Sequence, residues 1–195
     1  KDNKNQWITN SFSRGRVHLM RSCHDCIITS SETVIKDNPK LNCRIKGLER
    51  FTPTRIILDR EMKTPKNSKI LISESSKKTI IFYNTFNKKK AEHYKNFNIK
   101  LYKIPINKDN QLDLKKALIK IKQLGFTRVF LESGLRLVSS FLYNNLIDDF
   151  ALFKSNKKIN RNGRARFLKH FRLFLNNKTK KIEQVNLFGD KLVTY

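Results

Sequence analysis

Acidic residues are scarce in this sequence of 195 residues, where 16 Asp and Glu stand against 42 Lys and Arg and give a net charge of +26. No apolar run approaches the ~18 residues of a transmembrane helix, so we expect no membrane span. Three cysteines are an odd number and too few for a disulfide scaffold, which favours a reducing compartment such as the cytoplasm. Six glycines without a repeat period exclude collagen-like and repeat proteins.

The common nucleotide-binding and hydrolase motifs are also missing. The sequence contains no G-x-G-x-x-G, no G-x-x-x-x-G-K-[ST], no G-x-S-x-G and no H-E-x-x-H. A C-x-x-C is present at Cys23 and Cys26, with His24 inside it, but Cys43 stands alone and supplies no second metal-binding pair. Because the motif joins a helix end to a buried strand, we interpret these cysteines as structural, and we expect no metal.

The positive charge has two interpretations. One is a polyanionic partner, either nucleic acid or a phosphorylated substrate. The other is compositional drift, because Lys, Asn and Ile are abundant together, as A- and T-rich codons would produce. The basic residues are scattered rather than gathered in one block, so we favour drift and do not expect a nucleic-acid partner. They are spread through 86–103, 115–122, 154–172 and 178–181.

Apolar residues make up 38% of the chain, including 14 Phe, which is enough for one domain with a core. Short β-branched runs predict strands at 26–30, 41–44, 54–58, 69–72, 79–83, 100–104, 128–131 and 149–154. Caps and apolar stripes predict helices at 11–22, 88–96 and 135–146 and one that begins at Asn110 or Asp113 and runs to 124. A short helical turn is also expected, capped by Ser30 or Ser31 and stopped by Pro39. Alternation at the end predicts an antiparallel pair of strands, 167–175 with 181–194.

Strands that alternate with helices predict an α/β fold with a mostly parallel sheet flanked by helices, and the chain ends in a C-terminal antiparallel hairpin. Ligands of such sheets bind beyond the carboxyl ends of strands, here the loops 29–44, 59–65 and 132–140. The last loop is the most informative. Glu132, Ser133 and Gly134 follow a buried strand and lead into a helix, whose free N–H groups attract phosphate. A simple loop with a helix cap explains the same residues equally well.

Three blocks of sequence then form one ordered pattern. W-I-T at 7–9, His18 and Arg21 precede a T-V-x-x-D-x-P-x-L-x-x-R run that extends from Thr33 to Arg44. PTRIILD at 53–59 and VFLESGLRLVSSFLYNNLIDDF at 129–150 follow in the same order. Together they resemble the C-terminal reductase domain of the bifunctional riboflavin-biosynthesis deaminase/reductase, from Trp7 to about Phe150. The tail beyond 150 matches only weakly.

The resemblance implies a dihydrofolate-reductase-like fold and an NADPH-dependent reductase. Its reaction would be reduction of 5-amino-6-(5-phosphoribosylamino)uracil to the ribitylamino phosphate, by hydride transfer to the anomeric carbon of the sugar. It also implies a phosphorylated pyrimidine substrate and assembly as a homodimer. An upstream zinc deaminase domain is expected in the same polypeptide. The deaminase signature and the family's first reductase strand are not in these residues, so we expect 1–195 to be a single reductase domain that lacks that strand.

The resemblance also assigns roles to individual residues. Asp37 takes the catalytic position beside the cofactor. Contacts to the cofactor are implied for Trp7, Thr33, Asp37, Arg60, Gly134, Leu135, Arg136, Leu137, Val138, Ser139 and Ser140. Contacts to the substrate are implied for Asn5, Arg21, Leu41, Arg44 and Glu132, with the two arginines suited to the 5-phosphate.

Two departures from the family pattern keep other functions open. Arg136 is unusual so near a diphosphate, and the family's A-P-K-x-x-G segment reads Lys154-Ser155-Asn156-Lys157 here. The alternatives are a pterin reductase on the same fold, an inactive reductase remnant, and a basic RNA-binding module. Two arginines suit a phosphorylated substrate better than a pterin, and scattered charge argues against RNA.

Overall fold

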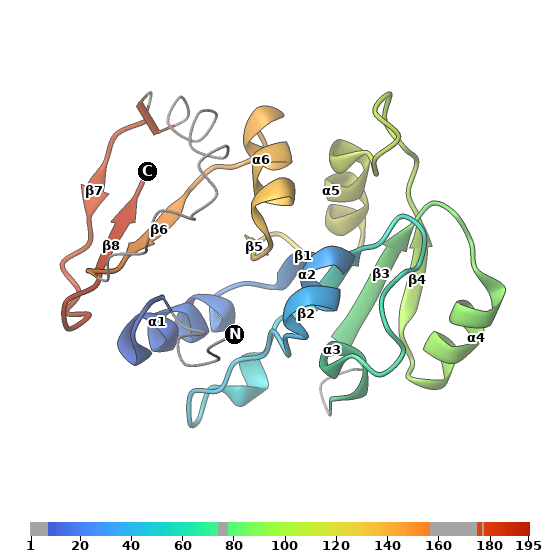
Figure 1. The fold of residues 1–195 in the computed structure, drawn as a ribbon, viewed down its shortest axis with the longest axis horizontal. Helices are drawn as coiled ribbons and strands as arrows, with labels where there is room; N and C mark the ends of the chain where they lie inside the picture. The colour runs from blue at the N-terminus through green and yellow to red at the C-terminus, as the bar shows by residue number, and fades with distance from the viewer. Residues whose placement is uncertain (1–7, 74–77, 157–174, 177) are drawn as a thin grey trace, which may run out of the picture. The chain divides into compact units, whose positions relative to one another are not determined.

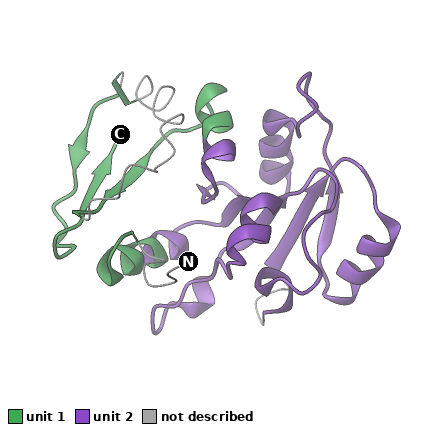
Figure 2. Cartoon of the chain, in the orientation of Figure 1, with its two compact units in different colours: residues 1–18, 139–195 green, residues 19–138 purple. Residues whose placement is uncertain are grey.

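A computed structural model describes residues 8–73, 78–156, 175–176 and 178–195 of the chain. The chain divides into two compact units, one of residues 1–18 and 139–195 and the other of residues 19–138 (Figure 2). Within the described ranges, no helix is both long enough and apolar enough to cross a membrane.

The larger unit contains a parallel sheet of five strands in the order β4-β3-β2-β1-β5 (Figure 1). The strands are β1 (Cys26–Ser30), β2 (Thr54–Leu58), β3 (Thr79–Tyr83), β4 (Lys100–Lys103) and β5 (Val129–Leu131). Each of the first three has four successive buried residues, as expected of strands covered on both faces. The α/β class and the parallel sheet predicted from sequence are therefore confirmed.

One charged side chain is buried within this sheet. Arg55 of β2 is fully buried, and its guanidinium donates to Thr79 Oγ1 of β3 at 2.7 Å. Burial lowers the pKa of Arg55 to about 10, so the group stays charged at neutral pH. Arg55 is the arginine of the PTRIILD block. Its role in the structure is to join β2 to β3 by this hydrogen bond.

Helices connect the strands of the larger unit. They are α2 (Ser31–Asp37), α3 (Lys69–Ile72), α4 (Lys88–Asn96), α5 (Leu114–Gln123), a 3-10 turn η1 (Glu49–Phe51) and the start of α6 (Leu135–Tyr143). Asp113 caps α5 by accepting from Lys116 N, and Ala117 and Ile121 of the predicted stripe are buried. The core contains Ile27, Val34, Leu41, Ile57, Met62, Ile70, Leu71, Ile81, Tyr94 and Ile99.

The smaller unit contains an antiparallel sheet of three strands in the order β6-β8-β7. Its elements are β6 (Ala151–Lys154), β7 (Lys181–Ile182), β8 (Lys191–Thr194) and most of α1 (Ser11–Ser22). Asp190 ties the helix to the turn before β8, because its carboxylate accepts from Ser13 Oγ at 2.6 Å and Asn10 N at 2.9 Å. Antiparallel pairing at the C-terminal end is thus confirmed.

Several predicted elements are wrong in detail. Residues 69–72 form the helix α3 rather than a strand, and Ile70 and Leu71 on it are both fully buried in the core. Residues 41–44 form no strand, because Leu41 has the left-handed backbone angle φ 49°. The predicted strand 181–194 is split into β7 and β8.

Two further predictions concern the C-terminal half of the chain. The helix predicted to reach 146 ends at Tyr143, because Asn145 adopts a left-handed φ of 53°. The strand predicted at 167–175 falls almost entirely on residues 157–174, which lie outside the described residues.

Candidate active site

The order of the strands in the larger unit's sheet indicates where a ligand would bind, at the carboxyl ends of two of the strands. From β1 the chain adds β2, β3 and β4 on one side, and β5 then pairs with β1 on the other side. The carboxyl ends of β1 and β5 therefore flank the point where the direction of winding reverses, which is where open α/β sheets bind ligands. Helix α2 begins directly after β1, and α6 begins after the short loop 132–134 that follows β5.

Three hydroxyl groups meet at this point. Ser30 at the end of β1 caps α2, with its Oγ accepting from Thr33 N at 3.2 Å. The hydroxyl oxygens of Ser30 and Thr33 lie 3.0 Å apart, and Ser133 after β5 lies 3.0 Å from Thr33 Oγ1 and 3.1 Å from Ser30 Oγ. Gly134 N also donates to Thr33 Oγ1 at 3.0 Å. These contacts join the loops after β1 and β5 into one rigid group.

The beginning of α6 next to this group can attract an anion. The first N–H groups of a helix have no partner within the helix and carry partial positive charge. Arg136 in the first turn of α6 pairs with Glu32 in the first turn of α2 at 3.0 Å. Their side chains are 71% and 54% exposed, so the ion pair is weak and either group can exchange its partner for a ligand.

Arg21 and Glu132 form a second and much less exposed ion pair. Arg21 Nε donates to Glu132 Oε2 at 2.9 Å and Nη2 donates to Oε1 at 2.6 Å, a bidentate arrangement. The two side chains are 10% and 31% exposed. Arg21 Nη1 also donates to the carbonyl oxygen of Asn42 at 2.9 Å, while the exposed Arg44 reaches Asn42 Oδ1 at 3.4 Å. Arg21 thus contacts both Glu132 and Asn42, and Arg44 contacts Asn42 as well.

Other residues that the resemblance singled out occupy varied surroundings. Asp37 lies at the exposed end of α2, four residues after Thr33 and so on the same face of that helix. Leu41 is buried in the core, with 3% of its surface exposed. Arg60 follows β2, pairs with Glu61 and donates from Nη1 to Asn110 O at 2.5 Å.

The remaining candidates are on α6 or beyond the described chain. Leu135 is exposed at the start of α6, and the half-buried residues on the helix after Arg136 are Leu137, Val138, Ser139 and Ser140. Ser139 and Ser140 belong to the smaller unit, whereas Val138 is the last residue of the larger one. Asn5 and Trp7 lie outside the described residues.

Sequence reasoning missed Ser30, Asn42 and the bridging role of Ser133. Ser30 was expected only to cap a helix, and Asn42 carried no signal of its own. The pairing of β1 with β5 was the missing information, since neighbouring parallel strands bring their carboxyl ends together. Knowledge of that pairing would have placed Ser30 beside Ser133.

The C-x-x-C segment is separate from this site and is not built for chemistry. Burial raises the pKa of the Cys26 thiol to about 12, so the thiolate needed for metal binding or redox exchange does not form at neutral pH. Cys23 is exposed, and all three cysteines are free. Within the residues that the structure describes, no three His, Cys, Asp or Glu side chains are grouped as a metal site.

The sequence is similar to proteins of one known family. The family model described as RibD C-terminal domain matches residues 1–184. The Riboflavin biosynthesis protein RibD of Aquifex aeolicus is 32% identical over 152 residues, which are 78% of this chain and 40% of that protein. The chain therefore spans less than half the length of that relative. A protein of Buchnera aphidicola named 5-amino-6-(5-phosphoribosylamino)uracil reductase is 27% identical over 176 residues, 80% of this chain and 78% of that protein.

A solved structure shows the same fold. RibD from Acinetobacter baumannii matches with a TM-score of 0.75 and 25% identity, over 100% of this chain and 52% of that one. The fold and the sequence lead to the same family. The fold is a parallel sheet with a separate antiparallel sheet, and the sequence match extends along almost the whole chain. The chain belongs to the RibD C-terminal domain family, the reductase domain family of riboflavin biosynthesis.

Proposed function

We propose that the chain is the NADPH-dependent reductase of 5-amino-6-(5-phosphoribosylamino)uracil, with its site at the carboxyl ends of β1 and β5. The observation that carries this proposal is that residues 132–134 connect two groups of side chains. Ser133 and Gly134 contact the first group, and Glu132 binds Arg21 of the second. The first is the hydroxyl cluster beside the start of α6, and the second is the arginine cluster around Asn42. A dinucleotide and a phosphorylated sugar need two such anion-binding groups side by side.

The residues present fit the diphosphate of a dinucleotide cofactor. A Cβ on Gly134 would lie 3.6 Å from Thr33 Oγ1, so the absent side chain leaves the space in front of the hydroxyl groups open. Thr33, Ser133 and the first N–H groups of α6 would hold the phosphate oxygens, and Arg136 would turn from Glu32 toward them. When bound, NADPH supplies a hydride.

Arg44 is the side chain best suited to the substrate's phosphate. It is exposed, and its hydrogen bond of 3.4 Å to Asn42 Oδ1 is at the long limit for such a contact. A guanidinium binds a phosphate through two parallel hydrogen bonds. Arg44 would therefore fix one end of the substrate and leave the sugar beside Glu132.

Glu132 would accept hydrogen bonds from polar groups of the sugar or the base. Its carboxylate is fixed by the two hydrogen bonds from Arg21, and an oriented acceptor holds a bound hydroxyl more firmly than a mobile one. In this arrangement Arg21 acts by positioning Glu132. Asp37 and Thr33 share one face of α2 and would contact the ribose and nicotinamide of the cofactor.

The test is oxidation of NADPH by the purified chain with 5-amino-6-(5-phosphoribosylamino)uracil as substrate. We expect NADPH to be preferred to NADH, and Arg44→Gln to raise KM for the substrate about tenfold with little change in kcat. Lys108→Gln, at an exposed turn residue of the larger unit, is the matched control. If the chain neither oxidises NADPH nor binds it more tightly than NADH, the proposal is wrong and family membership indicates the fold alone.

A further inference from the structure

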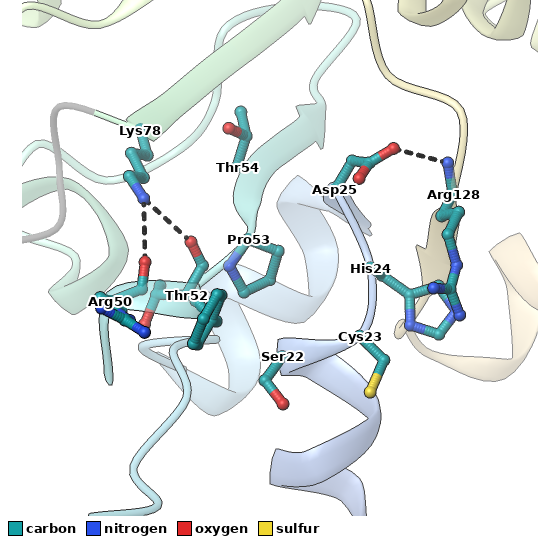
Figure 3. Close-up of a pocket in the computed structure, with 11 residues that line it drawn as sticks. Ser22, Cys23, His24, Asp25, Arg50, Thr52, Pro53, Thr54, Lys78 and Arg128 are labelled. Carbon is teal, nitrogen blue, oxygen red and sulfur yellow. Dashed lines mark hydrogen bonds between the residues drawn. The ribbon is translucent and has the colours of Figure 1, made fainter. Parts of the chain in front are cut away.

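A hollow lies at the end of the parallel sheet opposite to the candidate active site. It has a volume of about 320 Å³ and opens at the amino ends of the strands, within the larger unit. It is lined by Ser22, Cys23, His24, Asp25, Arg50, Phe51, Thr52, Pro53, Thr54, Lys78 and Arg128 (Figure 3). Because the strands are parallel, their amino ends lie together at the end of the sheet opposite to the candidate active site.

Three cations line this hollow. Arg50, Lys78 and Arg128 come from the segments before β2, β3 and β5. Among the residues that the structure describes, none of the three is in an ion pair with a carboxylate, unlike Arg21, Arg60 and Arg136 of the other end. Within the described part of the chain, no carboxylate ion pair therefore competes with an anion for these three groups, although the charge of Arg128 also acts on nearby Asp25.

The one acid in the lining is directed at the backbone. Asp25 Oδ2 accepts from Thr127 N at 2.8 Å, Thr127 Oγ1 at 3.0 Å and Arg128 N at 2.8 Å. These hydrogen bonds, the one from Arg128 N first, lower the pKa of Asp25 below its usual value. Since each N–H partly neutralises the carboxylate, Asp25 opposes an incoming anion less than an unbound carboxylate would.

Two of the cations are held in place. Lys78 Nζ donates to the carbonyl oxygens of Thr52 at 3.3 Å and Arg50 at 3.5 Å, as the dashed lines of Figure 3 show. Those acceptors are neutral, so they fix the ammonium group without cancelling its charge. The Arg50 guanidinium lies 4.8 Å above the centre of the Phe51 ring, which orients it by a cation–π contact. A pre-oriented cation loses less conformational entropy when it binds a phosphate.

The hollow also offers aromatic surface. Phe51 is 46% exposed, and the His24 ring is fixed by Nδ1, which lies 2.6 Å from Met20 O. The volume is at the lower end of the range for small-molecule sites, about 300–1,000 Å³. Cations for a phosphate, rings for a base and this size together match a mononucleotide.

We propose that this hollow binds a small phosphorylated metabolite of mononucleotide size, at a site separate from the active site. The probe is 5′-AMP, added to the isotope-labelled chain while backbone amide resonances are followed by NMR. We expect saturable shifts at residues 22–25, 50–54 and 127–128. Arg50→Gln combined with Arg128→Gln should raise the dissociation constant about tenfold or more, because charge-assisted hydrogen bonds are lost. Both side chains are exposed, so the fold should be retained, and unchanged thermal unfolding of the variant checks this.

Comparison probes make the result decisive. Lys108→Gln removes one exposed positive charge elsewhere and should leave AMP binding unchanged. Inorganic phosphate should bind more weakly than AMP, because it has no base to stack. The proposal is overturned if AMP shifts only residues 30–37 and 131–136, if it shifts none, or if phosphate binds as tightly as AMP. The proposal would also be overturned if a single-stranded RNA oligomer bound to these residues and AMP did not. The positive charge of the hollow would then indicate a nucleic-acid partner. None of these outcomes depends on reductase activity, so this proposal and the proposed function can fail independently.

Discussion

Replacement of Glu132 by glutamine tests the ion pair that orders the candidate substrate site. The variant Glu132→Gln keeps the shape of the side chain but leaves Arg21 facing a neutral amide. Arg21 is only 10% exposed on its side chain, so water cannot replace the lost carboxylate fully. A hydrogen bond between charged groups contributes about 1.5–3 kcal/mol, and the amide retains part of one of the two bonds. We therefore expect a loss of about 2 kcal/mol in the free energy of unfolding.

The assay is thermal unfolding followed by circular dichroism. For a chain of this size a loss of about 2 kcal/mol lowers the melting temperature by about 4–8 °C. Glu32→Gln is the matched control, since it breaks the exposed pair with Arg136 and should cost at most about 0.5 kcal/mol. Addition of Arg21→Met should cost less in the Glu132→Gln background than alone, which isolates the coupling of the pair. Our reasoning would be refuted if the effects of the two substitutions were additive, or if Glu132→Gln behaved like the control.

Three other predictions follow from contacts of the larger unit. Ser133→Ala removes the hydroxyl that bridges Thr33 to the end of β1 and should destabilise the protein by about 1 kcal/mol, measured by denaturant unfolding; an unchanged midpoint would mean that the bridge contributes nothing. Iodoacetamide at pH 8 should alkylate exposed Cys23 and spare buried Cys26, whose thiol has a pKa of about 12; mass spectrometry of the peptides decides, and modification of Cys26 in the folded protein would contradict the burial. Asp25→Asn should destabilise the protein at pH 7, because the pKa of Asp25 is lowered in the folded state. That difference should vanish as the pH falls below the usual value of 3.8 and through the folded pKa, and an acid titration of both proteins that kept it constant would exclude the carboxylate's charge as the cause.

The elements predictable from sequence are those that carry a local signal. Runs such as CIITS, TRIIL and TIIFY are buried on both faces and bounded by polar residues, so their strands were predicted at their observed bounds. The helix after Asp113 was predicted from its cap and its apolar stripe. Four residues at 69–72 are too few to show a period, so an apolar run of that length does not distinguish a buried strand from the short helix that forms there.

The residues of the candidate site were proposed from the sequence, but their contacts with one another could not be. The helix start after β5 was found from Gly134 and the apolar run before it, whose residues are partly buried in the structure. The ion pair between Arg21 and Glu132 joins residues far apart in sequence, and no local pattern encodes it. Both are expected to contact the substrate, and the structure adds that they also bind each other. Neither composition nor spacing distinguishes an arginine that binds a phosphate from one that orients a carboxylate.

The position of β5 has a consequence for how the protein folds. Strands β1 to β4 pair in sequence order, so this part of the sheet can assemble as the chain emerges during synthesis. Pairing of β1 with β5 must instead close a loop of about a hundred residues, and such long-range contacts form slowly. The hydroxyl cluster and the Arg21–Glu132 pair both depend on that late step. A chain arrested before β5 docks would retain most of its secondary structure but would have no assembled site, so loss of ligand binding should precede loss of the circular dichroism signal.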